Sequence, residues 1–325
     1  MPVIVNSHEQ HPFLPSIGHR AAIESSRALR QDIRPIEIAI LNLMADKQTT
    51  EKQLALWLGH SPIQVNLTFV ATDSYIEKIR NGHESANTPH EHVQKFYLPF
   101  SEIKDQKFDG LIVTGVNALK DRVEDETIWP EVTNLFEWSK THVLSSLLLC
   151  WGAKAALKYF HDIDSVKGER KTFGVFDHEL REDKTGVLFG FPDRFPAPVS
   201  RWKNPRRDQI EAAQGLDILA DSVESGPNIL AEPRAYDEGR AYYPLRLYLL
   251  NHPEYDTQTL GNEYRRDSAN CPTCPPPAHY FENDDPSAPP LNTWRHTAAL
   301  YRNWVNLIYA ATPYELEKVP MPWRE

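Results

Sequence analysis

The chain has 325 residues, of which 25% are charged and 41% hydrophobic, a composition typical of a globular protein with a substantial core. Its formal net charge of −10 argues against a nucleic-acid binder, so an anionic substrate would need a local cluster of cations. No apolar run reaches the length of a membrane span, and residues 1–14 lack the apolar segment of an export signal. We therefore expect a cytoplasmic protein that does not bind membranes, with no disulfides among its three cysteines.

Apolar runs alternate with helical patterns in the first half of the chain. We expect strands at residues 36–43, 63–71, 108–115 and 143–149, and helices at residues 50–58 and 129–140. A further helix is expected to start at Thr88 as N-cap, followed by Pro89 and Glu91. This alternation predicts an α/β fold, with a doubly wound, mostly parallel sheet and helices on both faces. Such sheets carry their functional residues at the carboxyl ends of the strands.

The pattern changes after residue 172, where shorter strand-like stretches are separated by Pro, Gly and Asp. We expect these to complete the core and to wall the site. Later segments are predicted as a helix around residues 264–266, a proline-rich loop at 268–290, a last helix at 293–310 and an extended tail after Pro313. We divide the chain into an N-terminal arm (1–35), a single catalytic domain (36–316) and a C-terminal tail (317–325).

Cys150 stands between an apolar run and the start of a helical pattern. A cysteine on such a strand-to-helix turn lies next to unpaired backbone N–H groups and the positive end of a helix dipole, which favour the reactive thiolate. The alternative is an inert core cysteine. A second apolar run, at residues 245–250, ends just before His252 and Glu254. Residues two apart in an extended segment point the same way, so this pair fits the base and the orienting carboxylate of a triad.

Cys271 and Cys274 form a CxxC pair in a proline-rich segment. Zinc would need further ligands, and only His279 lies nearby in the sequence, so we favour a plain loop and no metal site.

Several stretches together resemble the homoserine O-succinyltransferase / homoserine O-acetyltransferase family, whose members have a class I glutamine amidotransferase-like (flavodoxin-like) fold. The matching segments lie between about residues 26 and 316. They include residues 31–35, 40–44 with Lys47, 84–92, 108–115, Cys150-Trp151, 174–179, 197–201, 252–260, Trp294-Arg295 and 312–314.

The resemblance implies a ping-pong transfer of an acyl group from acyl-CoA to the hydroxyl of L-homoserine, early in methionine biosynthesis. It makes Cys150 the nucleophile, His252 the proton acceptor and Glu254 its partner. It also implies that Lys171, Ser200 and Arg266 bind the amino acid. The acyl site is implied to contain Lys47 and Leu119. It implies acyl-CoA as co-substrate without a bound cofactor, small-molecule substrates only, and a homodimer. The carboxylate of homoserine suits Arg266 and Lys171.

This chain departs from the family at positions that choose the substrates. Leu119 stands where the family has glycine with succinyl donors and glutamate with acetyl donors. Leucine fills space that a longer acyl chain needs, which favours acetyl, whereas neighbouring Lys120 would attract a succinyl carboxylate. Val199 replaces a family histidine and Asn251 a glycine, and residues 237–247 look longer than usual. L-serine or another hydroxy amino acid therefore stays open as acceptor, as do a glutamine amidotransferase-type hydrolase and a paralogue that only binds ligand.

Overall fold

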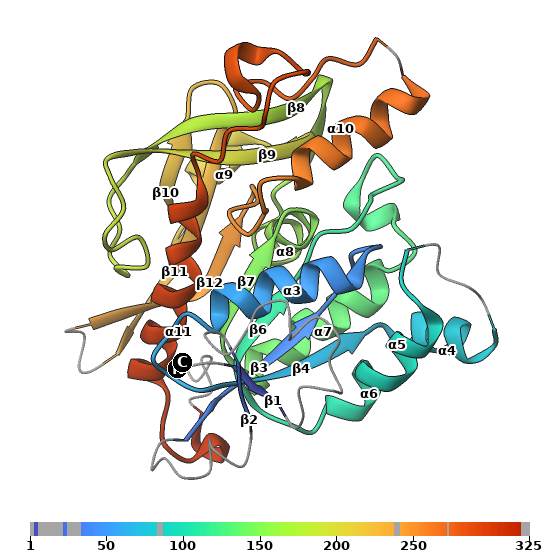
Figure 1. Cartoon of the computed structure of the whole chain (residues 1–325). Coiled ribbons are helices and arrows are strands. Elements are labelled where there is room, and N and C mark those ends of the chain that lie inside the picture. The colour runs from blue at the N-terminus through green and yellow to red at the C-terminus, as the bar shows by residue number, and fades with distance from the viewer. Residues whose placement is uncertain are drawn as a thin grey trace.

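The computed structural model describes residues 3–5, 22–24, 34–82, 87–236, 241–271 and 273–319, with the backbone alone for the first two segments. Within these residues the chain forms one twelve-stranded sheet with helices on both faces (Figure 1). The predicted α/β fold is confirmed. The parallel strands, in spatial order, are β2 (Ala22–Glu24), β1 (Val3–Val5), β4 (Val65–Ala71), β3 (Ile36–Leu41), β6 (Phe108–Val113), β7 (Val143–Leu149) and β12 (Ala241–Leu249), with β5 (Leu98–Pro99) beside β4.

An antiparallel extension continues the sheet beyond β12, and Figure 1 shows its outer strands beside α10. Its strands are β11 (Gly226–Tyr236), β10 (Asp217–Ser222), β8 (Ser165–Leu180) and β9 (Arg194–Pro205). The expectation of short strands here is wrong, because β8 alone has 16 residues. The prolines that suggested interruptions are tolerated where they lie. Pro196 and Pro198 are on the edge strand β9, and Pro233 lies at a register shift in β11.

The two faces of the sheet carry separate apolar cores. One contains Leu54 of α3 and Trp304 of α11, and the other contains Phe136 of α7 and Leu157 of α8. No helix in the described ranges is both long and apolar enough to span a membrane. The α-helices are α3 (Lys47–Leu58), α4 (Asp73–Arg80), α5 (His90–Phe96), α6 (Phe100–Ile103), α7 (Trp129–His142), α8 (Trp151–His161), α9 (Arg207–Ala212), α10 (Thr259–Asn270) and α11 (Ala299–Ala311). Short 3₁₀ turns are η1 (Val123–Asp125), η3 (Glu282–Asp284), η4 (Arg295–Ala298) and η5 (Leu316–Lys318).

The central pair β7 and β12 sets the position of the site. All seven residues of β7 are buried, as expected for a strand covered on both faces. The two strands are parallel, with Leu149 paired to Leu249 at their carboxyl ends. Residues that follow β7 and β12 therefore emerge together at one edge of the sheet.

Two expected helix starts are wrong. Helix α3 begins at Lys47 rather than residue 50, because the Asp46 side chain caps it by accepting from the Thr49 N–H (3.0 Å). Thr88 is not the N-cap of α5. Its hydroxyl instead donates to the Ala45 carbonyl (2.8 Å) and accepts from the Lys47 N–H (3.1 Å), which joins two loops.

The C-terminal segment also differs from expectation. The last predicted helix divides into the 3₁₀ turn η4 and helix α11, and the tail contains the turn η5 instead of being extended throughout. Most of the expected N-terminal arm (residues 1–35) and residues 320–325 lie outside the described ranges. The proposed division into arm, domain and tail stays a prediction.

Candidate active site

Cys150 occupies the sharp turn between β7 and α8, as the sequence predicts. Its φ of 48° and ψ of −106° are rare for a residue with a side chain, and its N–H donates to the Leu249 carbonyl (2.7 Å). Two glycines make room for this turn. A Cβ at Gly152 would lie 2.7 Å from the Val113 carbonyl, and one at Gly115 would lie 3.3 Å from the Cys150 Cβ.

His252 and Glu254 lie just beyond β12, beside the cysteine turn. His252 Nδ1 and Glu254 Oε1 are 2.6 Å apart, and both side chains are buried. The second carboxylate oxygen of Glu254 accepts from the Tyr301 hydroxyl of α11 (2.9 Å). The imidazole stacks on the Tyr255 ring, with centroids 4.2 Å apart. The carboxylate and the stacked ring hold the imidazole in one orientation.

The negative charge of the Cys150 thiolate and the positive charge of the His252 imidazolium stabilise each other. Burial by itself raises the pKa of the Cys150 thiol, but the charges of Lys154, His252 and Arg201 outweigh it and lower the pKa to about 6. For His252, burial lowers the pKa, whereas Glu254 and Cys150 raise it to about 10. At neutral pH the pair is therefore a thiolate and an imidazolium. Such a thiolate is the nucleophilic form of cysteine.

The three residues expected to bind the amino acid converge on two carboxylates of α10. Lys171 Nζ lies 3.4 Å from Glu263 Oε2 and 2.8 Å from Asp267 Oδ2. The Ser200 hydroxyl donates to Glu263 (2.5 Å), and the Arg266 guanidinium donates to Asp267 (2.8 Å). Sequence analysis missed both acidic residues. Their spacing of four on a helix is the signal that would have placed them on one face.

Tyr255 connects this amino-acid cluster (Lys171, Ser200, Glu263, Arg266 and Asp267) to the histidine. Its hydroxyl donates to Glu263 Oε1 (2.8 Å), and its ring lies against the His252 imidazole. The Tyr255 side chain therefore lies between the amino-acid cluster and the His252 imidazole.

Lys47 is buried below the turn that follows β3. Its ammonium donates to the carbonyls of Asn42 (2.6 Å) and Met44 (3.3 Å) and lies 4.6 Å from the centre of the Tyr75 ring. Burial lowers its pKa to about 8, although Glu51 acts in the opposite direction. Met44 itself lies beside Gly115, because a Cβ there would be 3.6 Å from the Met44 sulfur. Lys47 thus holds a loop that borders the cysteine turn.

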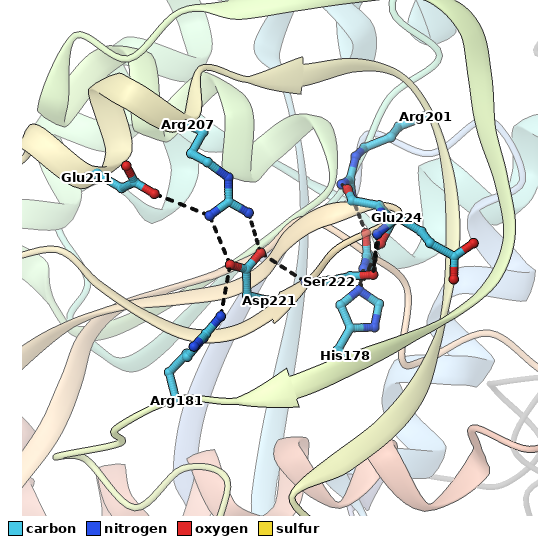
Figure 2. Close-up of polar contacts among 10 residues, drawn as sticks. His178, Arg181, Arg201, Arg207, Glu211, Asp221, Ser222 and Glu224 are labelled. Atoms are coloured by element: carbon cyan, nitrogen blue, oxygen red, sulfur yellow. Dashed lines mark hydrogen bonds and ion pairs between the residues drawn. The ribbon is translucent and has the colours of Figure 1, made fainter.

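The substrate-choosing positions differ in their surroundings. Leu119 is 82% exposed in the loop after β6, whereas Val199 and Asn251 are completely buried. Asn251 accepts a hydrogen bond from Arg201 and donates to His178 Nε2 (2.9 Å). Figure 2 shows Arg201 above His178, with the side chains that link them in between. The buried polar residues Arg201 and His178 position the segment that leads into His252, a role that sequence analysis did not find.

The expectation that the chain has no disulfide is wrong, because Cys271 and Cys274 are bonded to each other. The turn at the end of α10 brings their Cα atoms within 5.3 Å, in the range a disulfide spans, and the Cys274 N–H donates to the Cys271 carbonyl (2.9 Å). Across the described part of the chain, His, Cys, Asp and Glu side chains form no group that would hold a metal ion.

The fold, with a cysteine on the turn after a central strand and a histidine after the neighbouring strand, places the chain in the class of α/β proteins with a class I glutamine amidotransferase-like architecture. A solved structure from Thermoplasma acidophilum, described as part of a GMP synthase, superimposes with a TM-score of 0.50 at 13% identity, covering 85% of this chain and 96% of that one. The predicted class I glutamine amidotransferase-like fold is confirmed.

A family model described as homoserine O-succinyltransferase matches residues 3–314. Similar proteins include a homoserine O-acetyltransferase of Chelativorans sp., 43% identical over 92% of this chain and 91% of that protein. Another, from Ruegeria sp., is 42% identical over 90% and 89%. The chain belongs to the homoserine O-succinyltransferase family, so the resemblance found in the sequence is confirmed. The prediction that the protein is a homoserine O-acyltransferase is confirmed as well.

Proposed function

We propose that the protein transfers an acyl group from acyl-CoA to the hydroxyl of L-homoserine through an acyl-thioester on Cys150. The observation that carries this proposal is the thiolate-imidazolium pair at the carboxyl ends of β7 and β12, with Glu254 fixing the imidazole (2.6 Å). We assign Cys150 as nucleophile, His252 as proton carrier and Glu254 as orienting carboxylate.

In the first half-reaction the Cys150 thiolate attacks the thioester carbonyl carbon. The oxyanion that forms lies at the start of α8, where backbone N–H groups such as that of Trp151 have no partner within the helix. When the carbonyl re-forms, the bond to the CoA sulfur breaks, and His252 gives its proton to the leaving thiolate. The products are free CoA, acyl-Cys150 and a neutral imidazole.

The second half-reaction uses the change in charge that the first creates. Acylation removes the negative charge of Cys150, which is one of the two charges that raise the pKa of His252. Burial, which lowers the pKa of His252, is then opposed by Glu254 without the help of Cys150, so the pKa falls. The neutral imidazole is therefore available as a base. It accepts the hydroxyl proton of the amino acid, whose oxygen attacks the acyl carbon. The carbon–sulfur bond breaks and the thiolate-imidazolium pair is restored.

The amino-acid cluster suits a zwitterion. Two cations, Lys171 and Arg266, are balanced there by Glu263 and Asp267, so the cluster is neutral as a whole. A bound amino acid can replace the ion pairs within the cluster. Its ammonium would pair with Glu263, and its carboxylate would pair with Lys171 and Arg266. The Ser200 hydroxyl, which donates to Glu263, adds a further polar contact.

For the acyl donor we favour acetyl-CoA, with Lys47 and Leu119 at the acyl site. The names of the two relatives above, both acetyltransferases, support acetyl as donor. No bound cofactor is needed, because the thioester supplies the activated acyl group. We also propose a cytoplasmic homodimer that acts in methionine biosynthesis.

A matrix of acetyl-CoA and succinyl-CoA against homoserine and serine, followed by release of free CoA thiol, tests donor and acceptor together. We expect turnover with acetyl-CoA and homoserine. Intact mass of protein incubated with donor alone should show one added acyl group, which Cys150→Ala abolishes. If the adduct is absent, or if Cys150→Ala keeps full turnover, the proposed mechanism is wrong. Release of ammonia from glutamine through Cys150 would support the amidotransferase alternative instead.

A further inference from the structure

Lys154 lies one helical turn after Cys150 on α8, and its backbone N–H donates to the Cys150 carbonyl (3.1 Å). Side chains four apart share one face of a helix, and long side chains lean back toward its N-terminus. The Lys154 ammonium is therefore directed back toward the turn that carries the thiol. The side chain is 6% exposed, so solvent contributes little to its charge balance.

The cations around Lys154 are not balanced by carboxylates. Within the part of the chain that the structure describes, Lys154 has no ion pair, and its neighbours Arg201 and Lys203 are also buried. Among the described residues, both neighbours donate only to neutral oxygens. The acceptors are the side chains of Asn204 and Asn251 and the carbonyls of Leu250 and Ser225 for Arg201, and the carbonyl of Lys120 for Lys203.

The closest acidic side chains drawn with Arg201 are paired elsewhere. Figure 2 shows Asp221 between Arg207 and Arg181, on the far side of Ser222. Glu224 lies 3.9 Å from His279. Neither supplies a counter-ion for the three buried cations Lys154, Arg201 and Lys203.

A buried lysine at this place weakens the fold. An uncompensated buried charge is costly, and a cation in the first turn opposes the positive end of the helix dipole. The anion that acts on both Lys154 and Arg201 is the thiolate of Cys150. Lys154 therefore lowers the stability of the fold at its position. Its effect on the Cys150 thiolate explains why a lysine is found there.

We propose that Lys154 is a positioning residue, whose buried ammonium stabilises the Cys150 thiolate both when it attacks the donor and when it leaves the acyl group. This inference rests on the proposed role of Cys150 as acyl carrier. His252 gives up its proton during the first half-reaction, so its positive charge is absent when the second begins. Lys154 takes part in neither proton transfer. Burial, Arg201 and Lys203 lower its pKa, whereas the Cys150 thiolate raises it, so the ammonium is favoured again as Cys150 departs as the leaving group and the acyl ester forms.

The charges that act on the thiol agree with this role. Burial raises the pKa of Cys150, and Lys154 is the largest of the influences that lower it, ahead of His252 and Arg201. A further titratable group that interacts with the thiol is Tyr255, whose own pKa is raised by burial, by nearby Glu263 and Glu254, and by Cys150. Loss of Lys154 should therefore raise the pKa of the thiol by about one unit or more.

The test is the pH dependence of alkylation of Cys150 by iodoacetamide, located by peptide mass, in the wild type, Lys154→Met and Lys154→Gln. Both variants should shift the midpoint upward by about one unit or more, with the rate at about pH 6 reduced roughly fivefold and the rate above about pH 8.5 nearly unchanged. Both should also lower kcat at about pH 6 without changing KM for the amino acid. Lys158→Met is the matched control one turn further on, where Lys158 pairs with Asp162 and Asp164. It should leave the midpoint unchanged.

A wild-type midpoint in both variants would overturn the proposal. A wild-type midpoint in Lys154→Gln alone would also overturn it, because shape or hydrogen bonding rather than charge would then be responsible. Alkylation needs no acyl-CoA, so this result is separate from the function proposed above. Full turnover of Cys150→Ala would reject that function while leaving the alkylation midpoints as measured.

Discussion

Cys150 combines a strained backbone with a charge that its surroundings stabilise. A φ of 48° costs a residue with a side chain free energy of about 1–3 kcal/mol, and such strain is found at functional turns. The flanking Leu149 and Trp151 are buried, so the sheet and the helix determine the conformation between them. The turn sets the thiol beyond the strand end, where Lys154 and His252 lower its pKa.

Glu254→Gln tests the orienting role at this scale. The amide keeps the shape but removes the charge that raises the pKa of His252, and it can present its NH₂ group to Nδ1. We expect kcat to fall by about 10²–10⁴, as when the carboxylate of a serine-protease triad becomes an amide. Tyr301→Phe removes only one hydrogen bond to Glu254 and should cost roughly tenfold or less. Thiol release measures both, and equal rates for Glu254→Gln and wild type would contradict the assignment.

At the scale of elements, the close approach of α8 to β6 builds the cysteine turn. Gly152→Ala tests it, because a Cβ there would lie 2.7 Å from the Val113 carbonyl and 2.8 Å from the Thr114 carbonyl. Alanine is the better helix former by about 1 kcal/mol, but the clash is with backbone that cannot turn aside. We expect a net loss of about 2 kcal/mol or more in free energy of unfolding, together with loss of acylation.

Gly261→Ala on α10 is the comparison for that experiment. Its added Cβ would meet the end of the Tyr280 side chain (2.9 Å), which can move more easily than backbone. Urea unfolding should therefore show a smaller loss for Gly261→Ala than for Gly152→Ala. The reverse order would mean that the contact between α8 and β6 does not determine the turn.

The features that the sequence predicted well are those that depend on a short run of neighbouring residues. The buried run of β7, the turn at Cys150 and the His252–Glu254 pair follow from adjacent residues. Lys154 was not found, because a lysine in a helical pattern is usually at the surface and only tertiary packing buries it. The length of β8 was missed because its first eight residues are half-buried or exposed, so no apolar run marks that half as a strand.

At the scale of the whole molecule, an acidic protein contains a local buried cluster of cations. The formal net charge is −10, yet Lys154, Arg201 and Lys203 are buried together. His178 stands in the same region, completely buried between Ser225 and Asn251. Burial and the neighbouring Arg201 lower its pKa to about 3. This buried region around His178 therefore resists the addition of one more positive charge.

This makes His178 a determinant of acid stability. Its pKa is about 3 in the folded protein and 6.5 in the unfolded chain, so below about pH 6.5 only the unfolded state takes up the proton. The free energy of unfolding should thus fall as the pH is lowered from about 6.5 toward 3. Between about pH 7 and 4.5 this histidine accounts for a loss of about 2–3 kcal/mol, which His178→Gln should remove. Urea unfolding at both pH values measures it. His279→Gln, at a half-exposed position, is the control, and the same pH dependence in His178→Gln as in wild type would contradict the prediction.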